Sequence, residues 1–177
     1  MRRLMLLRHA KTEHDAPSGR DQDRRLDKRG RADAAEIGGW IGQHPPFPDL
    51  VLVSPAVRGQ QTWEIAWEAM KDLAPEPQVE LVPELYGADP SQLLQTIRET
   101  TATDAKRLML VGHNPGMHEL AFALAGSGDT ASRKALADNL PTSGLAVLDF
   151  AIDDWDDVAL RRGRLVLFVS PKLLKQI

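Results

Sequence analysis

The stretch LMLLRHAKTE, residues 4–13, combines a short apolar run with reactive residues at its end. Leu4 to Leu7 are apolar, Arg8 and His9 follow at once, and the chain then becomes polar. An apolar run of this length that is bounded by polar residues is typical of a buried strand. We therefore expect a strand that carries Arg8 and His9 at its carboxyl end.

Five further apolar runs have the length of a strand and are rich in Val and Leu. They are Leu50 to Val53, Val79 to Val82, Leu108 to Val111, Leu145 to Phe150 and Leu165 to Val169. Helical patterns separate most of these runs, and this alternation favours a parallel sheet covered by helices. We predict an α/β fold, a three-layer α/β/α sandwich with a mostly parallel six-stranded sheet. The last two strands are expected to pair as an antiparallel or mixed edge.

Three expected helices begin with capping signals. Asp27 precedes a pattern of period 3.6 and can act as its N-cap. Ser54 followed by Pro55 is a strong start signal, because serine suits the N-cap and proline the first helical position. Asp89 and Gln92 have the spacing of a capping box.

Composition narrows the classes of protein that the chain can belong to. With 177 residues, 42% of them apolar, we expect one domain spanning residues 1–177. The 22 basic and 25 acidic residues give a net charge of −3, which argues against nucleic acid or an anionic membrane as partner. The chain has no cysteine, which excludes disulfides and thiolate chemistry. No segment approaches the ~18 apolar residues of a membrane span, so we expect a soluble, cytoplasmic protein.

Two arginines and two histidines are expected at one edge of the sheet. Arg8 and His9 end the first strand, Arg58 follows the second, and His113 follows the strand Leu108 to Val111. The carboxyl ends of parallel strands line one rim, where ligands gather. Guanidinium groups and helix N-termini bind phosphate well, so the four residues together favour a phosphoryl group as ligand.

Histidine can attack phosphorus when one ring nitrogen is neutral and unshared and the other is held by a hydrogen bond. One histidine is enough for this step, and the second imidazole, if protonated, would donate to the phosphoryl oxygens. Two arginines and one imidazolium already offset the charge of the phosphate. We therefore expect no metal and no other cofactor.

These residues lie in segments that resemble the histidine phosphatase superfamily, the phosphoglycerate mutase-like enzymes. LLRHAKTE resembles the RHG signature of that family, with Ala10 in place of the glycine. The segments LVSPAVRGQQT, VPELYGADP, LMLVGHNPG and NLPTSGLAVLDF are similar to its other motifs, so the likeness covers nearly the whole chain. The small size and the ending FVSPKLLKQI are most similar to the short SixA-type phosphohistidine phosphatases.

The resemblance implies roles for individual residues. His9 would accept the phosphoryl group, Arg8 and Arg58 would hold it, and His113 would complete the pocket. Glu84 stands near a glutamate that protonates the leaving oxygen in many relatives, although an ordinary loop carboxylate explains Glu84 equally well. Ser143 precedes a strand at the same rim, where its hydroxyl could bind phosphate or stabilise a turn.

The length of the chain bears on the substrate. Only 22 residues separate Pro90 from His113, and they must hold a helix and a strand, so little remains to cover the pocket. An open pocket favours a phosphorylated protein, above all phosphohistidine, whose imidazole leaves more readily than an alkoxide. The alternatives are a small phosphomonoester as substrate, phosphomutase activity, or a module that binds phosphorylated ligands without turnover.

Overall fold

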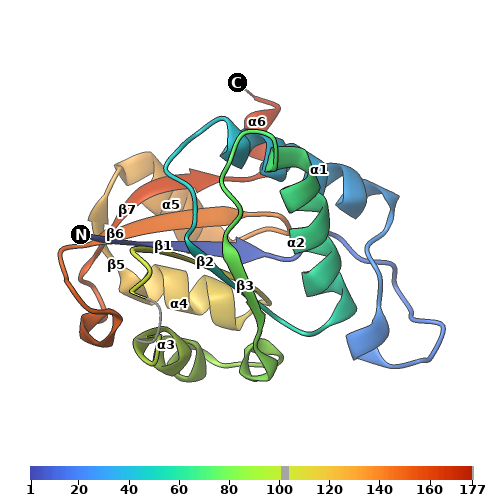
Figure 1. The fold of residues 1–177 in the computed structure, drawn as a ribbon, viewed down its shortest axis with the longest axis horizontal. Helices are drawn as coiled ribbons and strands as arrows, with labels where there is room; N and C mark the ends of the chain where they lie inside the picture. The colour runs from blue at the N-terminus through green and yellow to red at the C-terminus, as the bar shows by residue number, and fades with distance from the viewer. Residues whose placement is uncertain (101–103, 177) are drawn as a thin grey trace.

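The computed structural model describes residues 1–100 and 104–176, and within them seven strands form one sheet in the order β3-β2-β4-β1-β6-β7-β5 (Figure 1). The strands are β1 Arg2–Arg8, β2 Leu50–Val53, β3 Gln78–Leu81, β4 Arg107–Gly112, β5 Ala125–Gly128, β6 Leu145–Phe150 and β7 Gly163–Val169. The helices are α1 Lys28–Gly42, α2 Val57–Met70, α3 Pro90–Arg98, α4 Gly116–Leu124, α5 Thr130–Asp138 and α6 Pro171–Leu174. Short 3-10 helices lie at Asp21–Asp23, Pro83–Leu85 and Trp155–Asp157.

The sheet is mostly parallel, as the alternation of strands and helices predicted. β1, β2, β3 and β4 pair in parallel, and β5 is parallel to β7. Only β6 runs the other way, antiparallel to both β1 and β7. The carboxyl ends of β1, β2 and β4 and the beginning of β6 therefore meet at one rim of the sheet.

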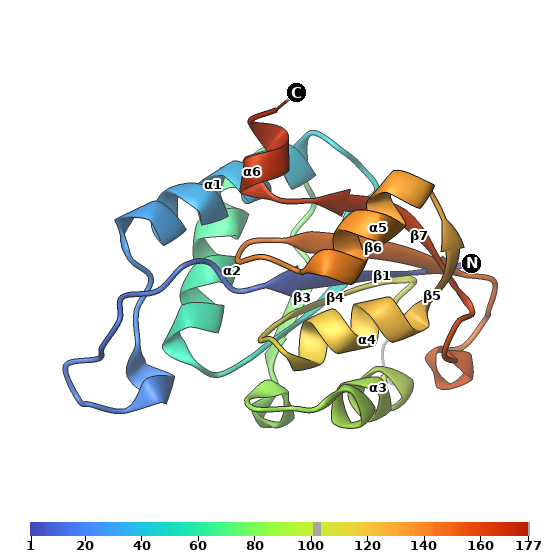
Figure 2. The ribbon, with the colours of Figure 1, turned by 180° about the vertical axis from the view of Figure 1, so that it is seen from behind.

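Apolar residues cover both faces of the sheet, which explains why its central strands are uninterrupted apolar runs. Leu4 and Leu6 of β1 face a core cluster that includes residues of α3, α4 and α5, whereas Met5 and Leu7 face a second cluster with α1 and α2. Figure 2 shows α3 and α4 on one side of the sheet and α1 and α6 on the other. The sheet is therefore the middle of three layers, as predicted.

Two of the three capping predictions are confirmed and one is wrong. Asp27 caps α1 through its side chain, and Asp89 forms a capping box with Gln92 at the start of α3. Ser54 does not cap α2, because this helix begins at Val57 and has no side-chain cap. The Ser54 hydroxyl is instead hydrogen-bonded to a histidine at the rim.

The prediction of six strands is also wrong, because β5 adds a seventh at the edge beyond β7. The last two predicted strands, β6 and β7, do pair antiparallel, but β7 is not the edge. The β5 sequence AGSG has two glycines and no branched apolar residue, so it carries no strand signal. Close packing requires Gly126, because a Cβ there would collide with the carbonyl of Arg161.

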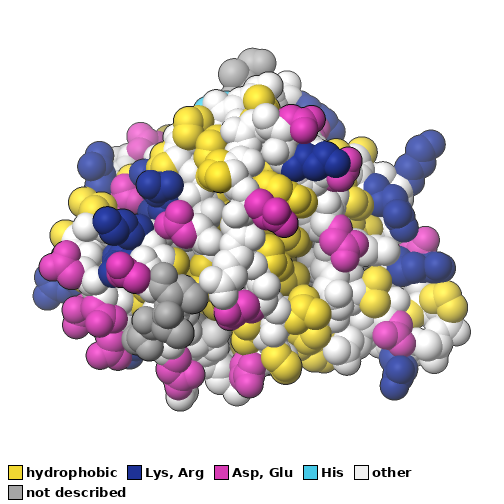
Figure 3. Space-filling view, in the orientation of Figure 1, with side chains coloured by type: hydrophobic (Ala, Val, Ile, Leu, Met, Phe, Trp, Pro, Cys, Tyr) yellow, Lys and Arg dark blue, Asp and Glu magenta, His cyan; other side chains and the backbone are white. Residues whose placement is uncertain are grey.

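The surface carries charges of both signs. Acidic and basic side chains are interspersed on the face shown in Figure 3. Apolar side chains are exposed at the β3 edge, where Val79 and Leu81 are both solvent-accessible. In the part of the chain that the structure describes, no helix has the length and apolarity needed to cross a membrane.

Candidate active site

The rim at the carboxyl ends of β1, β2 and β4 brings the predicted residues together. Arg8 is in register with Gly112 of β4, and the His9 N–H donates to the Gly112 carbonyl at 3.0 Å. His113 therefore follows its strand directly beside His9. Because β6 is antiparallel, its start lies at the same rim, and the Ser143 N–H donates to the carbonyls of Arg8 and His9 at 3.2 Å each.

The four predicted side chains line one open cleft with a volume of about 620 Å³. Arg8, His9, Arg58 and His113 contribute to its wall, together with Lys11, Thr12, Glu13, His14, Arg24, Asp27, Asn114 and Thr142. Residues that are far apart in the sequence thus converge on one concave surface. Such a cleft with several cationic groups suits a phosphorylated ligand.

The two imidazoles lie side by side, with ring centroids 5.2 Å apart and ring planes at 52°. Nδ1 of His9 is 2.7 Å from the carbonyl oxygen of Ala10. A carbonyl only accepts hydrogen bonds, so Nδ1 carries the hydrogen and Nε2 keeps its lone pair. This is the arrangement that the attack of a histidine on phosphorus requires.

Both imidazoles are neutral near pH 7. Burial lowers the pKa of His9 to about 3, and the neighbouring His113, Arg58 and Arg8 lower it further. Burial likewise lowers the pKa of His113 to about 4, with Arg58 as the next cause. In the free protein, His113 is therefore a neutral imidazole, not the imidazolium whose possible role the sequence raised.

Arg58 is buried and held rigidly. Only 6% of the residue is exposed. Its Nη1 donates to the Asp21 carbonyl at 2.8 Å, and its Nη2 donates to the Asp21 carboxylate at 2.9 Å. Arg8 is held more simply, because its Nη1 donates to the Leu140 carbonyl at 3.2 Å.

Within residues 1–100 and 104–176, four buried side-chain polar atoms have no hydrogen-bond partner in the protein. They are Arg8 Nε, Arg58 Nε, His113 Nδ1 and Ser143 Oγ. Buried polar groups are normally paired, so an unpaired one calls for an explanation. All four belong to residues predicted for the site. Two guanidinium N–H groups, one ring nitrogen and one hydroxyl are chemical groups that can bind phosphoryl oxygens.

Ser143 has an unusual backbone conformation. Its φ is 58°, in the left-handed region that residues other than glycine rarely adopt. The residue is fully buried, and its N–H is fixed by the two carbonyls of the β1 end. A strained residue that is held in this way is typical of functional sites.

Ala10 fits its position without strain. The residue does not have a positive φ, and it is fully buried against Leu26 and Ala34. Its N–H donates to the Thr62 hydroxyl at 2.9 Å. The alanine in place of the signature glycine therefore leaves the backbone at the site intact.

Glu84 does not line the cleft that the four rim residues form. Glu84 is exposed and lines a separate hollow with Tyr86, Gly87 and Gln92. Tyr86, two residues further on, contacts the site, because its ring packs against His113 with centroids 5.6 Å apart and ring planes at 85°.

Sequence reasoning missed Asp21, which lies in a mixed-charge segment that resembles a solvated loop. Its carboxylate accepts hydrogen bonds from Arg58, from the Tyr86 hydroxyl at 2.7 Å and from Arg24 Nε at 3.0 Å. The Tyr86 hydroxyl, with Arg58 and Arg24, lowers the pKa of Asp21 to about 2. Asp21 and Arg58 are 37 residues apart, so no local pattern marks their pairing.

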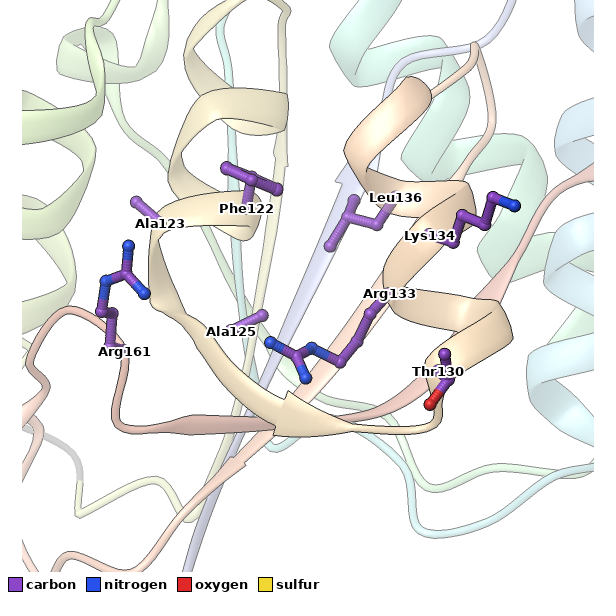
Figure 4. A pocket seen from close by; sticks show the side chains of 8 residues that line it. All are labelled: Phe122, Ala123, Ala125, Thr130, Arg133, Lys134, Leu136 and Arg161. Atoms are coloured by element: carbon purple, nitrogen blue, oxygen red, sulfur yellow. The ribbon is translucent and has the colours of Figure 1, made fainter.

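Another hollow lies away from these residues, between α4, β5 and α5 (Figure 4). Phe122, Leu136, Arg133 and Arg161 are among the side chains that line it. None of the residues predicted for the site lies there, so the candidate site remains the cleft at the rim.

The sequence and the fold are both similar to those of known proteins. The sequence model of the histidine phosphatase superfamily (branch 1) matches residues 4–108. A protein of Mycobacterium tuberculosis is 37% identical over 169 residues, covering 94% of this chain and 100% of the relative. A crystal structure from Agrobacterium tumefaciens, described as a candidate phosphohistidine phosphatase SixA, is 35% identical with a TM-score of 0.79, covering 96% of this chain and 98% of that one. A structure from Nakamurella multipartitia with the same description is 28% identical with a TM-score of 0.80, covering 96% of each chain.

Proposed function

The chain belongs to the histidine phosphatase superfamily and is a phosphatase, and we propose that His9 is its nucleophile and protein phosphohistidine its substrate. The observation that carries this proposal is the pairing of His9 Nδ1 with a backbone carbonyl, which leaves the Nε2 lone pair free on a residue that lines one cleft with Arg8, Arg58 and His113. The nucleophile, the two arginines and His113 thus lie in one cleft.

In the first step, the Nε2 lone pair of His9 attacks phosphorus as the bond from phosphorus to the substrate nitrogen breaks. The departing imidazole keeps the electron pair of that bond and takes up a proton from water. The Nε groups of Arg8 and Arg58, Nδ1 of His113 and the Ser143 hydroxyl bind the phosphoryl oxygens. Donors that are already in place stabilise the transferring group without reorganisation.

In the second step, a water molecule attacks the phosphorus of the phosphohistidine. The bond to Nε2 breaks, inorganic phosphate leaves, and His9 regains its lone pair. Two guanidinium groups offset the charge of the phosphoryl group throughout, so we propose that the reaction needs no metal.

The surroundings of the histidines favour a leaving group that needs little help from an acid. Glu84 lines a different hollow, and Asp21 is ionised because three donors bind its carboxylate. Neither supplies a carboxylic acid beside His9. An imidazole leaving group tolerates this better than an alkoxide.

The shape of the cleft also favours a protein substrate. Of the described residues between Pro90 and His113, most belong to α3 and β4, which leaves little chain to cover the rim. The cleft is open to solvent, so a phosphorylated side chain on another protein can reach it. The same openness admits small phosphomonoesters, which are the second candidate substrates. The descriptions of the A. tumefaciens and N. multipartitia structures agree with the first candidate.

A competition experiment tests the choice of substrate. A phosphorylated histidine-containing phosphotransfer domain and a panel of small phosphomonoesters, including p-nitrophenyl phosphate and the phosphoglycerates, would be offered at equal concentrations. We expect the highest kcat/KM for the phosphorylated domain and no interconversion of 2- and 3-phosphoglycerate. A higher kcat/KM for any small ester would overturn the protein substrate.

A trapping experiment tests the nucleophile. Radiolabelled phosphate quenched without acid should appear on His9, and His9→Ala should abolish both the label and turnover. His44→Ala, which removes an exposed histidine outside the cleft, should keep both. Undiminished turnover in His9→Ala would reject the mechanism, and a rate lost after dialysis against EDTA would reject metal independence.

A further inference from the structure

Ser54 is a fully buried serine that contacts the candidate site only through another side chain. It lies between β2 and α2, and no part of it is exposed. Its Oγ is 2.7 Å from Nε2 of His113. The two residues are neighbours because β2 and β4 are paired in parallel with Val53 opposite Val111.

The hydrogen bonds around Ser54 indicate the direction of this contact. The N–H of Ala56 donates to Ser54 Oγ at 3.3 Å, so one lone pair of the hydroxyl is already used. His113 Nε2 is the acceptor that the structure offers to the hydroxyl hydrogen. If Nε2 accepts, the single hydrogen of a neutral imidazole lies on Nδ1. Nδ1 is the atom of His113 that is buried and has no partner in the described protein.

The charges around His113 keep its ring neutral, so it matters which of the two ring nitrogens carries the single hydrogen. Burial is the largest effect that lowers the pKa of His113, followed by Arg58 of α2, with Arg8 of β1 and Arg24 acting in the same direction. Asp21 opposes them, and the rings of His9 and Tyr86 pack against the imidazole. The neutral ring has one N–H to offer, so the tautomer decides whether the unpaired Nδ1 carries a hydrogen or a lone pair.

We propose that Ser54 is a positioning residue that fixes His113 in the Nδ1–H tautomer, so that a neutral imidazole donates a hydrogen bond to the phosphoryl oxygen. This proposal rests on the proposed function, because the phosphoryl group is the target of the bond. The other tautomer would turn a lone pair toward an anionic oxygen and repel it. Ser54 therefore fixes the tautomer of His113, as the carbonyl of Ala10 fixes the tautomer of His9.

The tautomer can be measured without substrate. Long-range proton–nitrogen NMR of the imidazoles at pH 7 should show His113 with a protonated Nδ1 and an unprotonated Nε2. Ser54→Ala should move these shifts toward a tautomer mixture, and Ser54→Thr, which keeps a hydroxyl, should restore them. Ser170→Ala is the matched control, because Ser170 is also a buried serine but caps α6. A protonated Nε2 in the natural protein, or an unchanged Ser54→Ala spectrum, would overturn the proposal.

Kinetics with the phosphorylated phosphotransfer domain give a second readout. Ser54→Ala should lower kcat/KM at pH 7 by roughly 10- to 100-fold, as expected when the partner of a functional histidine is removed. Ser54→Thr, which keeps the hydroxyl, should recover most of this rate at pH 7, where His113 is neutral and needs a partner to fix its tautomer. An equal loss in Ser54→Ala and Ser54→Thr would indicate a merely structural role and would contradict the proposal.

The two experiments separate this proposal from the proposed function. If the natural protein turns over no phosphohistidine substrate, the proposed function fails while the NMR result still reports the tautomer. Titration with inorganic phosphate then shows whether Nδ1–H of His113 meets an anion. A shift of the His113 signals in the natural protein but not in Ser54→Ala is the supporting outcome, and equal shifts in both would contradict it.

Discussion

Each guanidinium of the site is held at its terminal nitrogens and leaves Nε free. Arg58 is held by Asp21, and Arg8 is held by the Leu140 carbonyl, while both Nε atoms are buried and unpaired. A donor that is fixed before the ligand arrives loses less freedom when it binds. At the scale of single residues, we therefore expect the affinity for a phosphoryl group to depend on the groups that hold the two arginines in place.

Asp21→Asn should therefore weaken phosphate binding. The amide keeps the shape of Asp21 but removes the charge that faces Arg58 and Arg24, so we expect kcat/KM to fall by roughly 3- to 10-fold. This is less than the loss of roughly 100-fold or more expected for Arg58→Ala, which removes a donor outright. Steady-state kinetics and calorimetric titration with inorganic phosphate measure the two effects.

Asp23→Asn is the matched control for this prediction. Asp23 lies in the same 3-10 helix, but its carboxylate pairs with Ser18 and Arg20. Equal losses in Asp21→Asn and Asp23→Asn would contradict a specific role for Asp21. Tighter phosphate binding in Asp21→Asn would show instead that the carboxylate competes with phosphate for Arg58.

The site residues that we predicted from the sequence differ in one respect from those that we missed. Arg8, His9 and His113 stand directly after apolar strands, so their place at the rim follows from the strand pattern. Asp21 and Ser54 act through contacts across the fold, and each has a sufficient local explanation, a solvated loop or a helix cap. A linear pattern cannot distinguish such local roles from distant contacts.

At the scale of elements, the position of Arg58 depends on how α2 packs against α1. A Cβ at Gly38 of α1 would collide with the backbone of Ala66 in α2, so the two helices cross in close contact there. Gly39, the next residue, has open space where a Cβ would lie. Two adjacent glycines of one helix thus have opposite packing requirements.

Gly38→Ala should destabilise the protein, and Gly39→Ala should not. The added methyl group at Gly38 must push α1 and α2 apart, which we expect to cost about 1–3 kcal/mol of unfolding free energy and to reduce activity through Arg58. Alanine at Gly39 should instead stabilise the helix by up to ~1 kcal/mol. Urea unfolding of both variants measures the difference, and equal stabilities would contradict the close crossing.

A buried hydroxyl ties α2 to the end of β1. Thr62 Oγ1 accepts the Ala10 N–H at 2.9 Å and donates to the Arg58 carbonyl at 2.7 Å. Thr62→Val should lower the unfolding free energy by about 1–3 kcal/mol, because it leaves the buried N–H of Ala10 unpaired. Thr62→Ser keeps the hydroxyl and should lose less. Equal unfolding free energies of the two variants would show that this hydrogen bond does not stabilise the protein.

Elements were predicted well where the pattern of apolar residues determines them, and poorly where tertiary packing does. β2 and β6 have the bounds that their apolar runs predict, because both faces of these strands are buried. β5 has no such run and forms because it pairs with the edge of β7 that β6 leaves free. β5 could be predicted from the sequence only if the free edge of β7 were already known.

At the scale of the whole molecule, the site makes stability depend on pH. His9 and His113 are neutral in the folded protein, with pKa values lowered by burial to about 3 and about 4. In the unfolded chain a histidine has a pKa of about 6.5. Between these pH values the unfolded state binds more protons than the folded state, so the unfolding free energy rises with pH. The stability that the two neutral histidines contribute is lost as the pH falls below about 6.5.

We therefore expect the protein to lose stability between pH 7 and pH 5, by an amount on the order of 2 kcal/mol for each of the two histidines. Urea unfolding at the two pH values measures this loss. His113→Asn should remove about half of it, because the asparagine does not titrate, whereas His14→Asn should leave it unchanged, since the His14 side chain is 98% exposed. Addition of inorganic phosphate at pH 7 should stabilise the natural protein in proportion to ln(1 + [phosphate]/Kd) and should have a smaller effect on Arg58→Ala. Equal pH dependence in the natural protein and in His113→Asn would show that His113 is not kept neutral in the folded state, and the tautomer assigned to its imidazole would then have no basis.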